Sequence, residues 1–172
     1  MAKKGEVSIY EVQKANKPTI DDVCEQLLTD PVLRGGMAHL LELSKELRMK
    51  PCWSHTNVWN CNYKSKRVAM YSIGRGDGWV KNWAKIKIYT TDVNDVERFL
   101  LTLPGEMRNE YINNMTCTHC GDCKPHNLTL LGEPLEVCWD IGYRHHNPTQ
   151  EQFGWIEKFI IARREYIKDT AV

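Results

Sequence analysis

The stretch that decides the fold lies in the middle of the chain and reads Trp83-Ala84-Lys85-Ile86-Lys87-Ile88-Tyr89-Thr90. Apolar and polar side chains alternate along it, so that Ala84, Ile86 and Ile88 share one face of an extended strand. This alternation is typical of an antiparallel strand with one buried and one solvated face. We therefore expect an antiparallel sheet.

Two stretches upstream complete a three-stranded meander in this prediction. The second strand covers residues 67–73, and three glycines between residues 74 and 78 predict the loop that follows it. The first strand reaches residue 61 and ends at a turn over residues 63–66. Period-two spacing places one set of side chains on a single face of that first strand: Trp53, His55, Asn57, Trp59 and Cys61.

Helical patterns flank the meander on both sides. We expect a short helix capped by Thr19, a longer one over residues 32–49, and two more between residues 92 and 114. A hairpin over 128–139 and a final amphipathic helix over 149–168 follow, the latter with a capping box at Thr149 and Gln152. The order predicts an α+β fold with a flexible N-terminal segment, 1–17, and one domain, 18–172.

The composition is that of an ordinary globular chain, with 172 residues of which 42% are hydrophobic and 26% charged. This length fits one domain and can bury a large core without disulfide bonds. No apolar run reaches the roughly 18 residues of a membrane span, and the polar start predicts no signal peptide. We therefore expect a cytoplasmic protein with reduced cysteines and no membrane partner.

Charge is unevenly distributed, although the formal net charge is only +1. Residues 51–91 contain seven lysines and arginines against one aspartate, and four of the six tryptophans. A basic, aromatic stretch offers stacking surfaces and partners for anions. The alternative interpretation is a plain antiparallel sheet with aromatic side chains inside and lysines outside.

Three of the seven cysteines form the most specific motif, Cys117-Thr118-His119-Cys120-Gly121-Asp122-Cys123. An odd number of cysteines argues against a complete disulfide set. Cysteines separated by two residues can place their thiolates on one tetrahedral zinc ion. Cys138 lies on the predicted hairpin that returns toward this loop. The motif therefore predicts a metal-binding loop at 115–139 with one structural zinc ion, held by Cys117, Cys120, Cys123 and Cys138.

Other interpretations of this loop stay open. His126 competes with Cys138 as the fourth ligand. Iron–sulfur proteins use similar cysteine spacing, although the fourth cysteine of the bacterial ferredoxin run is missing after Cys123. A redox dithiol formed by the first two cysteines of the motif, or a loop without any cofactor, are the remaining alternatives.

The aromatic sheet face points to a binding function, because ligand pockets are mostly apolar and aromatic with a few placed polar groups. We expect a zinc-containing domain that binds a small aromatic, cationic or anionic molecule. One alternative is a Cys/His-based or zinc-dependent enzyme, and another is a nucleic-acid-binding module that uses the basic segment 63–90. The expected ligand-binding residues are Trp53, His55, Trp59, Tyr71, Trp79 and Trp83.

Several features together resemble a set of uncharacterised small bacterial proteins. They are the helix pair before Pro51, the strand with Trp53 and Trp59, the block at residues 99–107, and the apolar helix after Asn147-Pro148-Thr149. Over residues 18–168 the layout is similar in outline to gyrase-inhibitor-like small-molecule-binding domains, here with an added cysteine-rich loop. The resemblance implies a compact α+β domain with an aromatic-lined concavity, and it implies no reaction.

Overall fold

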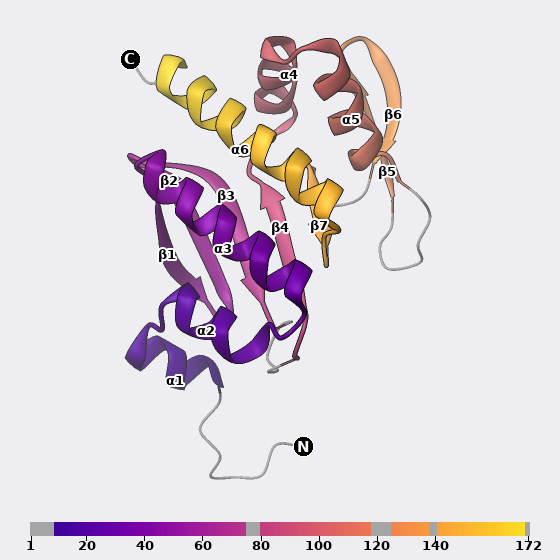
Figure 1. Ribbon diagram of the computed structural model, residues 1–172. Helices are drawn as coiled ribbons and strands as arrows, with labels where there is room; N and C mark the ends of the chain where they lie inside the picture. The colour runs from indigo at the N-terminus through magenta and orange to yellow at the C-terminus, as the bar shows by residue number, and fades with distance from the viewer. Residues whose placement is uncertain (1–8, 75–79, 118–124, 138–140, 171–172) are drawn as a thin grey trace.

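The structure, a computed structural model, describes residues 9–74, 80–117, 125–137 and 141–170. It has the α+β class that the sequence predicts. An antiparallel sheet of order β1-β2-β3-β4-β7 forms the main layer, and β5 and β6 form a separate hairpin. Figure 1 shows helices α3 and α6 lying side by side across one face of the sheet, while α4 and α5 stand beside the hairpin. The helices and strands are α1 Ile9–Asn16, α2 Ile20–Leu27, α3 Pro31–Glu46, β1 Lys50–His55, β2 Val58–Tyr63, β3 Lys66–Ile73, β4 Ala84–Ile88, α4 Val93–Thr102, α5 Gly105–Met115, β5 His126–Leu130, β6 Glu133–Val137, β7 Arg144–His146 and α6 Gln150–Thr170.

Residues 9–16 differ from the flexible N-terminal segment that we expected over 1–17. They form helix α1, which packs against β1. Its Gln13 is 2% exposed and accepts a hydrogen bond from the Trp53 indole at 3.2 Å. A buried polar side chain with specific partners holds this helix on the sheet, because burying it without partners would cost free energy.

The predicted helix starts are confirmed by their capping bonds. The Thr19 hydroxyl accepts from the backbone N–H of Asp22 at the start of α2. At the start of α6, the Thr149 hydroxyl accepts from the N–H of Gln152, whose side chain accepts from the N–H of Thr149 in return. Such reciprocal bonds satisfy N–H groups that have no partner within the helix.

The prediction of one continuous strand over residues 53–61 was wrong, because these residues belong to two strands, β1 and β2. A two-residue turn at Thr56 and Asn57 separates β1 from β2, and His55 pairs with Val58 across it. Asn57 has a φ of 58°, a left-handed conformation that asparagine tolerates better than most residues. Because a turn of two residues leaves the period-two pattern unbroken, the sequence pattern alone reads as one long strand.

The predicted core is confirmed. The apolar face of the meander is covered by α3 and α6, as the helical stripes of both segments indicated. Close packing extends to Gly36 of α3, where an added Cβ would collide with the ring of Phe153 on α6. Six side chains at this interface are all 0% exposed: Leu40, Val68, Ile86, Ile88, Ile156 and Ile160.

The edge of the sheet beside β4 holds a further strand that the sequence analysis missed. This strand is β7, in which His146 pairs with Lys85 and His145 pairs with Ile86. With only three residues, β7 is too short to show a periodic pattern. Among the described residues, none of the helices has the length and apolar character needed to cross a bilayer.

Candidate functional site

The base of the cysteine-rich loop is a small three-way junction centred on Val137. At the end of α5, Thr116 forms an isolated antiparallel bridge with Val137, and the Cys117 N–H donates to the Glu136 carbonyl at 2.9 Å. On the other side, His126 pairs with the same Val137 in the β5–β6 hairpin. The two ends of the loop therefore meet on either side of the residue that precedes Cys138 in the sequence.

Of the four predicted cysteine ligands, Cys117 alone lies within the described residues. It is 9% exposed and is not in a disulfide. Cys120, Cys123 and Cys138 lie outside the described residues. Within the described ranges, there is no group of three or more His, Cys, Asp or Glu side chains that could hold a metal ion.

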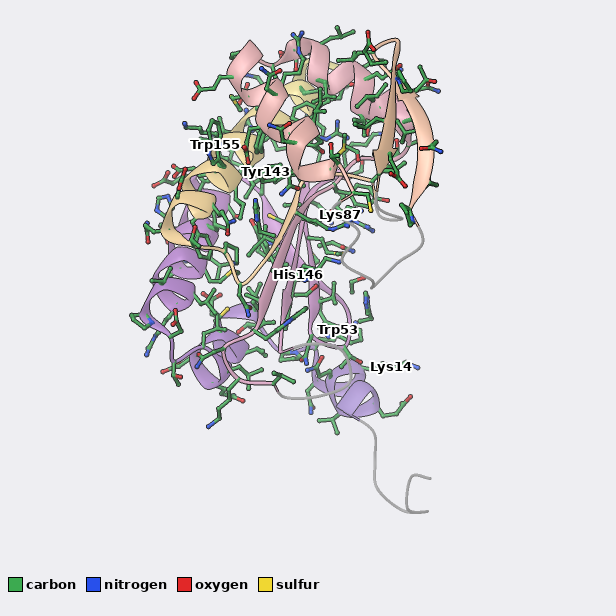
Figure 2. All side chains as sticks on the ribbon, turned by 90° about the vertical axis from the view of Figure 1, so that its right-hand side faces the viewer. Lys14, Trp53, Lys87, Tyr143, His146 and Trp155 are labelled. Carbon is green, nitrogen blue, oxygen red and sulfur yellow. The ribbon has the colours of Figure 1, made fainter. Side chains whose placement is uncertain are left out.

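An aromatic cavity lies between strands β1 and β2 and the segment that joins α1 to α2. Figure 2 shows one of its lining residues, Trp53, close to α1. Trp53 and Trp59 are directly opposite each other on β1 and β2, and both line a cavity of about 650 Å³. The Trp59 indole donates to the Pro18 carbonyl at 3.1 Å, and the Trp53 indole donates to Gln13. Both N–H groups therefore already have acceptors. Because Trp59 is almost fully buried, the ring surface of the cavity comes mainly from Trp53, with charged groups at Lys17, Asp21 and Lys50.

Of the five predicted ligand residues that the structure describes, Trp53 and Trp59 alone share a cavity. His55 is exposed at the end of β1, next to Ser54. Trp83 is half-buried and lies 5.8 Å from the His146 ring, between ring centroids. Trp79 lies outside the described residues. The described tryptophans are thus divided between the interior, where Trp59 is 1% exposed, and more open positions.

Tyr71, the remaining predicted ligand residue, is part of the core. Its side chain is 0% exposed, and its hydroxyl lies 3.2 Å from the Ser44 hydroxyl of α3. The Cys61 thiol donates to the same Ser44 oxygen at 3.4 Å. Burial raises the pKa of both the Tyr71 hydroxyl and the Cys61 thiol, so both stay protonated at neutral pH. This arrangement fixes α3 on the sheet.

A second polar cluster connects α5 to β7. The Tyr143 hydroxyl donates to the Glu110 carboxylate at 3.0 Å and lies 2.9 Å from His145 Nε2, which is 3.1 Å from the Asn114 amide. Burial and the Glu110 charge raise the pKa of Tyr143, whereas burial lowers the pKa of His145. Both groups are therefore neutral at pH 7, and their hydrogen bonds hold α5 beside the sheet.

Two other residues that line the aromatic cavity could not be predicted from the sequence. Cys52 lies at its rim as an exposed free thiol, and Pro18 closes it from the segment before α2. Neither residue belongs to a motif, and the spacing between positions 18 and 52 carries no local signal. Comparison with protein-family models, curated proteins and solved structures finds no match for this chain.

Proposed function

We propose that the protein is a small-molecule-binding domain whose cysteine-rich loop is closed by one zinc ion. The zinc ion would be held by Cys117, Cys120, Cys123 and Cys138. The observation that carries this proposal is the convergence of both loop ends on Val137. Neighbouring strands lie about 4.8 Å apart, so Thr116 and His126, on either side of Val137, are only about 10 Å from each other.

The donor set fits zinc better than other metals. Thiolates are soft ligands, and four of them satisfy the tetrahedral preference of zinc without leaving a position for water. The ion would then serve to fix a loop that has no apolar core of its own. His126, opposite Val137 on the neighbouring strand, remains the competing fourth ligand, and an iron–sulfur cluster remains the alternative occupant.

The proposal includes a reducing, cytoplasmic environment, because a zinc site of this kind needs free thiolates. The aromatic cavity supports the binding part of the proposal. Trp53 offers a ring face to a planar molecule, with the buried Trp59 packed beside it, and the cavity falls within the usual size range of ligand pockets, roughly 300–1,000 Å³. We propose a small planar aromatic compound as the ligand of this cavity.

Metal analysis tests the zinc site. Protein purified without chelator should contain about one zinc ion per chain by elemental mass spectrometry, since a site with four protein ligands loses its ion slowly. Cys120→Ser should remove most of this zinc. Cys52→Ser, at an exposed thiol far along the chain from the loop, is the matched control and should retain it. Absence of stoichiometric metal from the unaltered protein contradicts the zinc proposal, and iron in its place supports the cluster.

Tryptophan emission tests the aromatic cavity. Benzyl alcohol, benzylamine and benzoate carry the same ring with different charges, and binding of any of them beside Trp53 should shift the emission saturably. Trp53→Phe should remove most of this shift. Trp83→Phe, whose ring packs against His146 instead, should preserve it. If no compound shifts the emission, or if Trp53→Phe leaves the shift intact, the cavity is not the binding site.

A further inference from the structure

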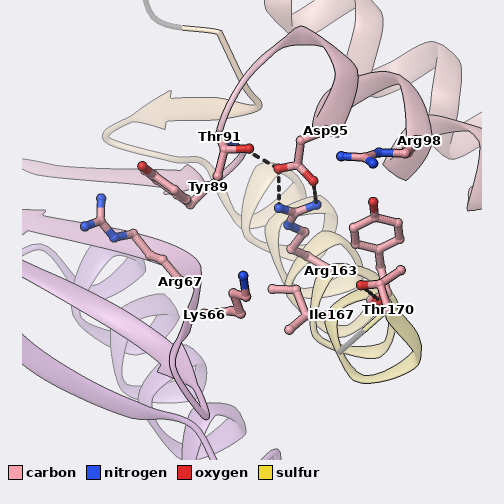
Figure 3. Close-up of a pocket in the computed structure, with 10 residues that line it drawn as sticks. Lys66, Arg67, Tyr89, Thr91, Asp95, Arg98, Arg163, Ile167 and Thr170 are labelled. Carbon is pink, nitrogen blue, oxygen red and sulfur yellow. Dashed lines mark hydrogen bonds and ion pairs between the residues drawn. The ribbon is translucent and has the colours of Figure 1, made fainter. Parts of the chain in front are cut away.

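A second cavity, of about 320 Å³, lies where the C-terminal half of α6 meets α4 and the start of β3. Figure 3 shows the residues that line it, which come from these elements and from the segment after β4. Four of its residues are basic and one is acidic. The residues that line it are Lys66, Arg67, Tyr89, Thr91, Asp95, Arg98, Arg163, Tyr166, Ile167 and Thr170.

The single carboxylate of this cavity is already used. Asp95 accepts two hydrogen bonds from the buried Arg163 guanidinium, at 3.0 Å and 2.5 Å, and a third from the Thr91 N–H at 2.9 Å. Lys66 and Arg98 are exposed, and within the described ranges neither forms an ion pair with an acidic side chain. The cavity thus keeps a local excess of positive charge although the whole chain is nearly neutral.

Two of the arginines are held in fixed orientations. The Arg67 guanidinium lies over the Tyr89 ring, 4.2 Å from its centroid. Arg163 lies 4.9 Å from the Tyr166 centroid, and its bidentate pairing with Asp95 restrains the guanidinium further. Stacking of this kind lowers the entropy that an arginine loses when it binds an anion.

One donor in the cavity wall has no acceptor. Arg163 is 3% exposed, and its Nε is buried without a hydrogen-bond partner among the described residues. Leaving such an N–H unpaired costs free energy, but this atom is closed off from the cavity, so a ligand there would not pair with it. The observation that favours a ligand rich in anionic oxygen is therefore the local excess of positive charge from Lys66, Arg67 and Arg98.

We propose that this cavity binds the phosphate group of a small phosphomonoester. Arg67 and Arg98 supply guanidinium groups whose geometry matches phosphate oxygens, and Lys66 adds a third charge. The volume accommodates a small metabolite, in contrast to the long groove that a nucleic acid backbone requires. The site lies apart from the Trp53–Trp59 cavity and shares no residue with it, so it does not rest on the proposed function.

Titration calorimetry at low salt tests this site with three probes: ribose 5-phosphate, inorganic phosphate and, as the neutral control, ribose. We expect both phosphates to bind and ribose to be inactive. Arg98→Ala and Lys66→Ala should each weaken binding about tenfold or more, the loss that one charge-assisted hydrogen bond brings. Arg34→Ala removes an equally exposed helix arginine outside the cavity and should leave the affinity unchanged.

Three outcomes would overturn the proposal. The first is absence of phosphate binding at millimolar concentration. The second is an equal effect of Arg34→Ala and Arg98→Ala, which would show a general charge effect. The third is binding of a ten-nucleotide single-stranded RNA without binding of either phosphate, which would favour the basic segment as a nucleic-acid surface. Unfolding midpoints of the variants, expected to match the unaltered protein because both residues are exposed, separate loss of binding from loss of fold.

Discussion

Replacing Asp95 by alanine should lower the free energy of unfolding by about 3–5 kcal/mol, because it leaves a buried arginine without its counter-charge. Asp95 is 6% exposed and Arg163 is 3% exposed, so water cannot take over the solvation of the guanidinium. Urea denaturation followed by circular dichroism measures this change. Asp169→Ala, at an exposed position on the same terminal helix as Arg163, is the control and should change stability by less than about 0.5 kcal/mol.

The double variant Asp95→Ala with Arg163→Met sharpens this test. Removing both charges should restore part of the stability that Asp95→Ala loses, since an apolar pair avoids the desolvation penalty. Two results would contradict a dominant role for the ion pair in this part of the core. One is a loss of under 1 kcal/mol of unfolding free energy in Asp95→Ala. The other is a double variant whose loss equals the sum of the losses in Asp95→Ala and Arg163→Met alone.

The same carboxylate should also shape the acid response of the protein. Burial alone would raise the pKa of Asp95, but hydrogen bonds from Arg163 and from the Thr91 N–H outweigh it, and the pKa is lowered in the folded state. Stability from this group is therefore complete above the unfolded pKa, near 3.8, and is lost as the pH falls through the lower folded value. The Asp95→Ala variant should lack this portion of the acid destabilisation.

Asn57→Ala should be the second severe change, with an expected loss of about 2–4 kcal/mol. Asn57 is 1% exposed, its amide donates to the Gly74 carbonyl at 3.0 Å, and its oxygen accepts from Gln13 at 2.6 Å. Alanine leaves the Gly74 carbonyl without this donor and the Gln13 side-chain amide without this acceptor in the interior. It also places a Cβ without a local hydrogen bond at a φ of 58°, which costs about 1–2 kcal/mol more.

Asn57→Gly separates the two contributions. Glycine removes the same side-chain hydrogen bonds but adopts the left-handed conformation freely, so it should be about 1 kcal/mol more stable than the alanine variant. The difference is measured from urea midpoints at a common slope. Equal stability of the two variants would mean that the turn conformation contributes nothing, and an alanine variant as stable as the unaltered protein would contradict the role of the hydrogen bonds.

The parts of the fold that depend on local pattern could be predicted from the sequence. Alternation at Ala84, Ile86 and Ile88 identified the buried face of β4, and the Thr149–Gln152 pair identified the start of α6. Both signals arise within one strand or one helical turn. The turn at Asn57 escaped because its stabilising partner, Gln13, is 44 residues away, and the intervening pattern does not reveal it.

The candidate sites also differ in whether their residues lie close together in the sequence. The cysteine-rich loop is visible in the sequence because its cysteines follow one another at short spacing, although the junction at Val137 appears only in the structure. The cavity proposed to bind phosphate is lined by Lys66, Arg98 and Arg163, which come from three separate elements. No spacing rule connects these positions, and each one reads in the sequence as an ordinary surface or helix charge.

The covering of the sheet by α6 has a consequence for how the chain acquires its structure during synthesis. Strands β1–β4 are complete by residue 88, yet the helix that shields β3 and β4 is made of residues 150–170. As the chain leaves the ribosome, the apolar face around Ile86 and Ile88 must stay without this shield while some eighty further residues are added, or be sheltered by a chaperone. The nascent protein is therefore most vulnerable to aggregation when it is already more than half made.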